Sequence, residues 1–113
     1  MPTTASRPLA AAMSEAQLLA IIRQACRTLG LLCYHTHDSR HSEVGFPDLV
    51  IVGAERVIYR ELKSARGRLS AEQRAWLDAL GRAGQDADVW RPDDLYSGRI
   101  IRELVGLRRR EVA

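Results

Sequence analysis

Three charged side chains stand at the ends of two apolar runs within residues 45–63. Asp48 opens the first run, Glu61 and Lys63 close the second, and Gly53 lies in the short polar turn between them. The β-branched composition of both runs predicts a β-hairpin. Because an antiparallel hairpin places the start of one strand beside the end of the next, we expect the three charged side chains to converge.

Two carboxylates and one ammonium at the end of a sheet suit a particular chemistry. Residues two apart on a strand share a face, so Glu61 and Lys63 should point the same way and Leu62 into the core. Mg²⁺ prefers oxygen ligands and takes one or two carboxylates together with waters and phosphate. Such a metal lowers the pKa of a bound water and stabilises charge that develops on a phosphate. A lysine with a readily shifted pKa can help to position or deprotonate that water.

The order and spacing of these residues carry a resemblance. Pro47-Asp48 followed by Glu61-Leu62-Lys63 resembles the PD-(D/E)XK nuclease motif. The continuation Gly67-Arg68-Leu69-Ser70, with Gln73 three residues later, is similar to one branch of that superfamily, the virus-type replication-repair nuclease (VRR-NUC) domain. The similarity spans roughly residues 14–94, and the three motifs are specific when they occur together in this order.

The resemblance implies an α/β fold with a PD-(D/E)XK restriction-endonuclease-like core, in which helices flank a mixed β-sheet. It also implies a metal-dependent DNA endonuclease. Asp48 and Glu61 would then bind Mg²⁺ or Mn²⁺, with the backbone carbonyl of Leu62 as a further ligand, and Lys63 would help to activate the attacking water. The alternative is a nucleic-acid-binding module that keeps the fold without cleavage, although such a module needs no acidic cluster facing phosphate.

Glu15 and Gln73 each have a structural and a functional interpretation. Glu15 lies in the first turn of an expected helix, where the helix dipole favours a carboxylate, and also at the end of that helix's apolar stripe. Gln73 stands three residues after Ser70, the position of a capping box. The resemblance favours a functional role for both, with Glu15 as a third acidic group and the Gln73 amide orienting groups in the site.

Arginine dominates the positive charge of this chain, which has 16 Arg, one Lys and a net charge of +3. The planar guanidinium suits phosphate, and a mild positive excess favours a nucleic-acid partner. We expect Ser39 and Arg40, in a polar loop over residues 36–44, and Arg66 and Arg68, after the hairpin, to contact DNA. The alternative for each is a solvated side chain.

A cysteine and three histidines leave a zinc site open as a third hypothesis. Alternation along the strand places Cys33, His35 and His37 on one face, with His41 nearby, but structural zinc sites usually show tighter paired spacing. The roles of the three histidines stay open. We expect Cys26 and Cys33 to be reduced thiols, as is usual in a cytosolic protein.

The 113 residues predict a single domain over residues 14–107, preceded by a disordered segment over 1–13 and followed by a basic tail over 108–113. Ser14 and Ser70 are the expected caps of two helices. The expected elements are a helix ending at Gly30, a strand over 31–35, the hairpin, a helix ending at Gly81 and Gly84, a strand over 87–91 and a helical segment from Pro92.

No apolar run approaches the length of a membrane span and the first residues are a poor secretory signal, so we expect a cytoplasmic protein of a bacterial or phage-infected cell. The resemblance implies a homodimer acting on branched DNA such as four-way junctions, whose near two-fold symmetry matches a pair of sites. The candidate interface is the last helix, through Ile100, Ile101, Leu104 and Val105, with Arg102 and Arg108 beside the junction arms. The alternative is that this helix covers the sheet of its own subunit.

Overall fold

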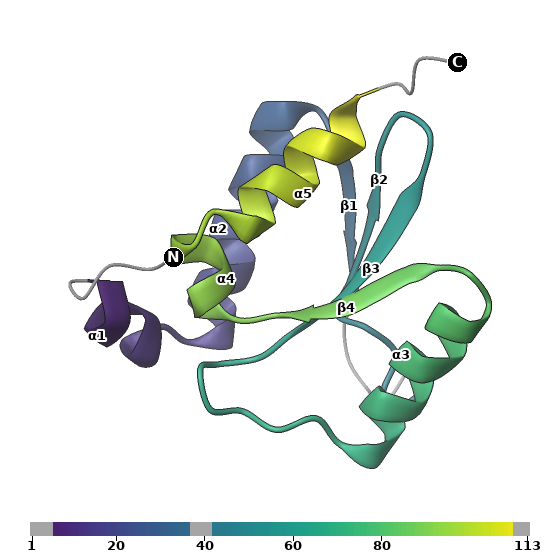
Figure 1. Ribbon diagram of the computed structural model, residues 1–113, viewed down its shortest axis with the longest axis horizontal. Coiled ribbons are helices and arrows are strands. Elements are labelled where there is room, and N and C mark those ends of the chain that lie inside the picture. The colour runs from purple at the N-terminus through teal and green to yellow at the C-terminus, as the bar shows by residue number, and fades with distance from the viewer. Residues whose placement is uncertain (1–5, 37–41, 110–113) are drawn as a thin grey trace.

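A four-stranded sheet forms the centre of the computed structural model, which describes residues 6–36 and 42–109 (Figure 1). Its strands are β1 (Leu32–His35), β2 (Leu49–Val52), β3 (Val57–Leu62) and β4 (Asp86–Trp90), and they lie side by side in that order. The first three are antiparallel, and β4 runs parallel to β3. The predicted hairpin and the predicted mixed α/β sheet are therefore confirmed.

The helices lie on both sides of this sheet. They are α1 (Ser6–Ala12), α2 (Glu15–Leu29), α3 (Ala71–Arg82), α4 (Pro92–Tyr96) and α5 (Arg99–Arg108). Helices α2 and α5 pack side by side over one face, and α3 forms the crossover between the parallel strands β3 and β4 (Figure 1). Within the ranges that the structure describes, no helix is long and apolar enough to span a membrane.

Local hydrogen bonds fix the starts of the two long helices. The hydroxyl of Ser14 accepts from the backbone N–H of Gln17 at 3.1 Å, and the Gln17 amide oxygen accepts from the Ser14 N–H at 2.8 Å. Ser70 and Gln73 form the same reciprocal pair at 3.1 and 2.9 Å. Both predicted capping boxes are thus present, and each satisfies two N–H groups that a helix start otherwise leaves unpaired.

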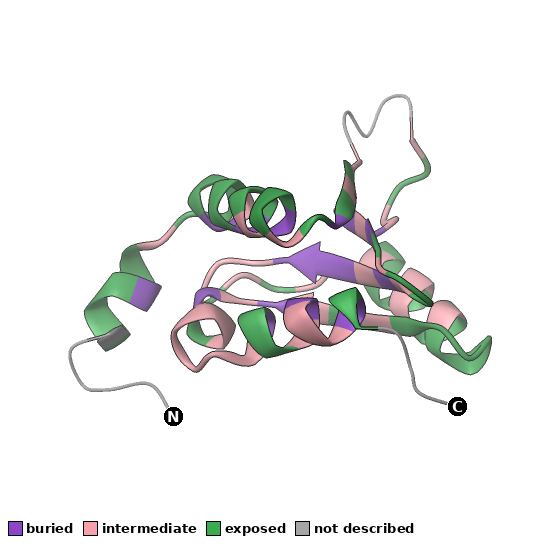
Figure 2. Ribbon diagram, turned by 90° about the horizontal axis from the view of Figure 1, so that it is seen from above, coloured by how far each residue is buried: buried purple, intermediate pink, exposed green. Residues whose placement is uncertain are grey.

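The core lies between the sheet and helices α2 and α5. The strand register aligns Cys33, Ile51 and Ile58 on one face, where side chains from α2 pack against them. The most deeply buried positions run along the central strands and the inner sides of the helices (Figure 2). Because side chains alternate along a strand, this register also directs Tyr59 and Glu61 to the opposite face.

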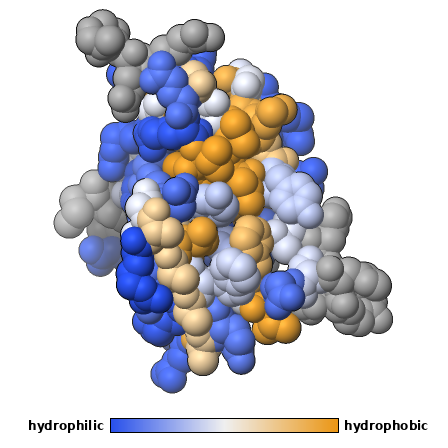
Figure 3. Space-filling view, turned by 90° about the vertical axis from the view of Figure 1, so that its right-hand side faces the viewer, coloured by the Kyte–Doolittle hydropathy of each residue, from blue (hydrophilic) through white to orange (hydrophobic). Residues whose placement is uncertain are grey.

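The opposite face is only partly covered. The side of α3 that carries Trp76 lies over it, and the Phe46 ring makes edge-on contacts with Tyr59 and Trp76. Within the described residues, α3 leaves much of this face of β1 and β2 uncovered, and Leu32 and Tyr34 are 73% and 60% exposed. Apolar groups consequently gather on this side of the molecule between hydrophilic margins (Figure 3).

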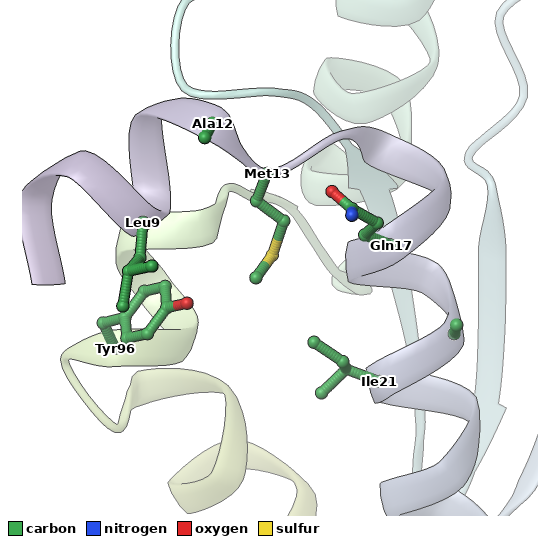
Figure 4. A pocket seen from close by; sticks show the side chains of 7 residues that line it. Leu9, Ala12, Met13, Gln17, Ile21 and Tyr96 are labelled. Atoms are coloured by element: carbon green, nitrogen blue, oxygen red, sulfur yellow. The ribbon is translucent and has the colours of Figure 1, made fainter.

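The prediction of disorder over residues 1–13 is wrong for the part that the structure describes. Residues 6–12 form α1, a helix too short to be stable in isolation. Ala10 is 2% exposed because α1 packs against α4. Side chains of α1, α2 and α4 enclose a hollow of about 430 Å³ into which Leu9, Met13 and Tyr96 point (Figure 4).

The inner face of the last helix has the second of its two expected roles and covers the sheet of its own subunit. The segment forms two helices with Gly98 between them, and Ile100 and Leu104 on α5 are fully buried in the core of their own subunit. These two side chains are therefore not available to a second copy. Ile101, on the outer side of α5, is 41% exposed.

A buried arginine joins α5 to the sheet. Arg60 on β3 is 2% exposed and donates to Glu103 Oε1 from Nη2 at 2.9 Å. The same oxygen accepts from Trp90 Nε1 at 2.9 Å, and Glu103 Oε2 accepts from Arg99 Nε at 2.8 Å. These bonds lower the pKa of Glu103 against the opposing effect of burial, and Asp86 pairs with Arg60 at 2.9 Å. One carboxylate therefore satisfies donors from two strands and one helix.

We expect Glu103→Ala to lower the free energy of unfolding by roughly 3 kcal/mol, because it strips a buried guanidinium of its main counter-charge. Urea denaturation measures this loss. The matched control is Asp78→Ala, at an exposed position of α3, which should change the stability by no more than about 0.5 kcal/mol. If both variants lost the same free energy of unfolding, the contacts of Glu103 would not be stabilising the fold.

Candidate active site

Asp48 is held at the start of β2 by three hydrogen bonds. Its Oδ2 accepts from the backbone N–H of Leu62 at 2.8 Å, across the hairpin. The N–H of Thr36 donates to the Asp48 carbonyl at 2.8 Å, and the Thr36 hydroxyl donates to the carbonyl of Pro47 at 2.9 Å. One bond thus fixes the carboxylate to β3, and the other two fix the backbone of residues 47 and 48 to the residue that follows β1.

Gly45, two residues before the Pro47-Asp48 pair, has a steric role. Gly45 has a φ of 91°, and a Cβ atom there would lie 2.5 Å from the backbone carbonyl carbon of Glu72. No larger residue fits without displacing the first turn of α3. Gly45 therefore allows the segment leading to Asp48 to pass directly against the helix that carries Gln73.

The side chain of Gln73 makes two different hydrogen bonds. Its amide oxygen completes the capping box, and its Nε2 donates to Glu61 Oε2 at 2.8 Å. The start of α3 and the end of β3 are therefore joined through one side chain. The geometry makes Gln73 a contact of the buried carboxyl as well as a cap.

Glu61 is a carboxyl group in a buried position, with 2% of its surface exposed. Lys63 Nζ lies 3.6 Å from Oε2, but Oε1 is buried and accepts no hydrogen bond within the described part of the chain. Burial, reinforced by the negative charge of Asp48, raises the pKa of Glu61 to about 8, and Lys63 opposes this shift. Ionising both carboxyl groups would therefore give the site more negative charge than its own donors compensate.

A divalent cation fits this imbalance. A hard cation takes one or two carboxylates and completes its shell with water and phosphate oxygens, and the unpartnered Oε1 beside Asp48 offers such a ligand. The structure does not assemble three His, Cys, Asp or Glu side chains into a metal-holding group anywhere in residues 6–36 and 42–109. The donor set thus consists of two neighbouring carboxylates.

Glu15 reaches the other side of Asp48. A cavity of about 190 Å³ between α2 and the sheet is lined by Glu15, Ala16, Leu19, His35, Asp48 and Leu62. Glu15 enters it from the exposed first turn of α2, where the helix dipole also favours a carboxylate. The structure therefore places Glu15 in a cavity shared with Asp48, and brings His35 to the same place.

The expected DNA contacts divide into two pairs. Arg66 and Arg68 are exposed on the turn that follows Lys63. Ser39 and Arg40 lie outside the described residues, so their positions stay predictions. His37 and His41 of the zinc hypothesis also lie outside them, while Cys26 and Cys33 are free thiols, as expected.

Two residues that support the site were missed from the sequence. Thr36 holds the backbone of residues 47 and 48, and Arg91 donates to two carbonyls of the turn after Lys63. Neither belongs to a recognisable motif. The one signal for Arg91 was its place at the end of the expected strand over 87–91, since the ends of the parallel strands β3 and β4 lie side by side.

Comparisons with known proteins agree with this geometry. The family model described as the VRR-NUC domain matches residues 3–93. Fanconi-associated nuclease 1 of Danio rerio is 37% identical over 62 residues, covering 53% of this chain and 6% of the relative. The Ailuropoda melanoleuca protein of that name is 39% identical over 54 residues, 46% of this chain and 5% of the relative. The chain thus spans only a small part of these curated relatives.

A solved structure described as a VRR_NUC domain protein has a TM-score of 0.62 to this chain at 18% identity. The match covers 85% of this chain and 91% of that one. At this level of identity the similarity shows a shared fold, and the mixed sheet with its flanking helices is common to both.

We expect stability without metal to fall as the pH rises from about 4.5 to about 8. An unfolded Glu61 loses its proton near the ordinary pKa of 4.5, whereas the folded group keeps it up to about 8. The folded state therefore binds more protons in this window, and raising the pH favours unfolding. Thermal melts in EDTA should show this slope in the wild type and a smaller one in Glu61→Gln.

Glu72→Gln provides the control for this experiment, because Glu72 is exposed on the first turn of α3. This variant should follow the wild-type pH dependence. A Glu61→Gln protein with the full wild-type slope would mean that another group titrates in this window.

Proposed function

This chain belongs to the VRR-NUC domain family, and we propose that it is a Mg²⁺- or Mn²⁺-dependent endodeoxyribonuclease that hydrolyses phosphodiester bonds. The observation that carries the proposal is the buried carboxyl of Glu61, with one unpartnered oxygen, beside Asp48 and 3.6 Å from the Lys63 ammonium. A buried acidic pair of this kind is unfavourable on its own and becomes favourable when it holds a cation.

The metal ligands in this proposal are the carboxylates of Asp48 and Glu61 and the backbone carbonyl of Leu62, with Glu15 as a further acidic group. A bound divalent cation supplies Lewis-acid stabilisation of phosphate charge and lowers the pKa of water. The hydrogen bond from Leu62 N–H to Asp48 Oδ2 leaves Oδ1 of that carboxylate as the natural ligand atom.

Lys63 and Gln73 act on either side of Glu61. The Lys63 ammonium lies where it can orient the attacking water and stabilise the negative charge of the phosphate. The Gln73 amide donates to Oε2 of Glu61, which would leave Oε1 to bind the cation. In the reaction, the water gives up a proton to solvent and its oxygen forms a bond to phosphorus. The ester P–O bond breaks, and the departing alkoxide takes up a proton from solvent.

DNA binding in this proposal depends on arginine contacts to the phosphate backbone. Arg66 and Arg68 are exposed close to Lys63 in the chain, and Ser39 and Arg40, which follow β1 in the sequence, are the other proposed contacts. Such contacts position the duplex and carry no sequence information. The alternative function, binding without cleavage, has less support because a buried acidic pair next to phosphate weakens binding unless a cation lies between them.

We propose branched DNA as the substrate and a homodimer as the active form. The two relatives bear the name nuclease, and a four-way junction requires two incisions at related positions. One Asp48/Glu61/Lys63 site cuts one strand at a time, so two sites related by two-fold symmetry match such a substrate. Cleavage of a panel of duplex, flap, splayed and four-way junction DNAs with Mg²⁺ or Mn²⁺ tests this choice.

The dimer surface in this proposal is the uncovered face of β1 and β2. It presents Leu32, Tyr34 and Val52, and β1 is an edge strand of the sheet (Figure 3). Contiguous exposed apolar groups and an uncovered sheet edge are favourable places for a second chain to pair. The inner face of α5 is excluded, since it is buried in its own subunit.

We expect Lys63→Ala to lower kcat by about 10²- to 10⁴-fold and Asp48→Asn to abolish cleavage, both with DNA binding largely intact. Nicking assays and binding titrations measure the two effects. Mg²⁺ or Mn²⁺ should raise the melting temperature of the wild type but not of Asp48→Asn, because a cation that binds only the folded form stabilises it.

Asp78→Asn is the matched control, an exposed aspartate on α3 that should keep both cleavage and the metal response. Asp48→Asn should melt no lower than the wild type in EDTA, because it removes a charge next to Glu61. Wild-type nicking by purified Asp48→Asn would reject the assignment of the site.

Leu32→Lys should convert a dimer to monomers that remain folded, because Leu32 is 73% exposed and its loss leaves the core intact. Light scattering at micromolar protein gives the mass, and the monomer should lose paired incision of a four-way junction. Ile101→Glu, on the exposed side of α5, is the control and should stay dimeric. A wild-type monomer that still makes paired cuts would contradict the dimer proposal.

A further inference from the structure

Arg91 donates two hydrogen bonds to the turn that follows Lys63. From its position directly after β4, its Nη1 reaches the carbonyl oxygens of Ser64 at 2.8 Å and Gly67 at 2.7 Å. The backbone N–H of Gly67 also donates to the Ser64 carbonyl at 3.2 Å, so these residues form a closed turn. One nitrogen of a guanidinium thus holds both ends of this turn.

The same turn packs along the Lys63 side chain. A Cβ atom on Gly67 would lie 3.4 Å from Cδ of Lys63 and 3.0 Å from the hydroxyl oxygen of Ser64. The lysine stem therefore runs against the backbone of Gly67, and only 12% of its side chain is exposed. The Lys63 N–H donates to the Trp90 carbonyl at 3.1 Å, which fixes the lysine backbone to β4.

Neighbouring contacts hold the backbone of Arg91 in place. Its N–H donates to Asp94 Oδ2 at 2.8 Å, and Asp94 Oδ1 pairs with Arg99 Nη1 at 3.2 Å. The next residue, Pro92, is buried at the start of α4. The guanidinium consequently projects from a backbone that the β4–α4 junction holds in one place.

We propose that Arg91 is a positioning residue that fixes the Lys63 ammonium beside Glu61 by clamping the Ser64–Gly67 turn against the lysine stem. Trp90 sets where the lysine backbone lies, and the clamped turn sets where its ammonium ends. A guanidinium suits this task because one planar nitrogen directs two hydrogens at two carbonyls. The consequence for catalysis rests on the proposed nuclease function, whereas the placement of Lys63 does not.

The chain supplies a direct readout, because Lys63 is its only lysine. Acetylation by an N-hydroxysuccinimide ester, located by peptide mass spectrometry, reports how accessible that single side-chain amine is. Arg91→Met should raise the acetylation rate of Lys63 several-fold, and Arg91→Lys, which keeps one donor group on the turn, should raise it less. The matched control is Arg82→Met, an exposed arginine at the end of α3, which should keep the wild-type rate.

The kinetic readout separates positioning from DNA contact. With Mg²⁺ and a DNA that the wild type cleaves, Arg91→Met should lower kcat by on the order of 100-fold with little change in KM, and Arg91→Lys should recover part of the loss. Arg82→Met should match the wild type. A raised KM with unchanged kcat and unchanged acetylation would make Arg91 a DNA contact and overturn the proposal.

Gly67→Ala perturbs the same turn from the opposite side, so it tests the clamp if Arg91→Met does not fold. It should also raise the acetylation rate of Lys63, because its Cβ meets the lysine stem and the Ser64 hydroxyl. A folded Arg91→Met or Gly67→Ala protein with the wild-type acetylation rate would refute the clamp. If the wild type cleaves no DNA, the nuclease proposal fails, and the acetylation rates still decide the role of Arg91.

Discussion

A buried carboxyl next to a second carboxyl is the constraint on which this structure depends. Burial and the charge of Asp48 both oppose ionisation of Glu61, and a carboxylate in such a place is destabilising unless something compensates it. Within the described part of the chain this compensation is incomplete, because the Gln73 amide and the Lys63 ammonium both lie beside one oxygen and no donor bonds to the other. A bound cation would favour the ionised carboxyl, and this makes the site suited to a divalent metal.

Strand β3 carries two buried ionisable residues, and their surroundings differ. Arg60 points to the core face, where Glu103 and Asp86 accept its hydrogen bonds and charge. Glu61, the next residue, points to the other face and keeps an unpartnered oxygen. The first arrangement stabilises the packing of α5 on the sheet, and the second leaves binding capacity for a ligand. Because side chains alternate along a strand, the two residues face opposite sides of the sheet.

The sequence allowed much of this arrangement to be predicted because its signals are local. Period-two alternation and a polar turn placed Asp48 beside the end of β3, as the Leu62–Asp48 hydrogen bond shows. The Ser70 capping box fixed the start of α3 through contacts three residues apart. Neither inference needed knowledge of distant residues, since strand pairing across a short turn and helix capping both follow from neighbours in the chain.

By itself, therefore, the sequence determined the hairpin, the helix starts and the convergence of its charged residues. Only the tertiary structure decided that residues 6–12 form a helix, that Leu104 is core and not interface, and that Arg91 holds the turn after Lys63. Each of these depends on contacts between segments far apart in the chain. One example is the hydrogen bond from Arg91 to the carbonyl of Ser64, which lies 27 residues earlier. Propensity and spacing are silent about such contacts, because they arise only when elements pack together.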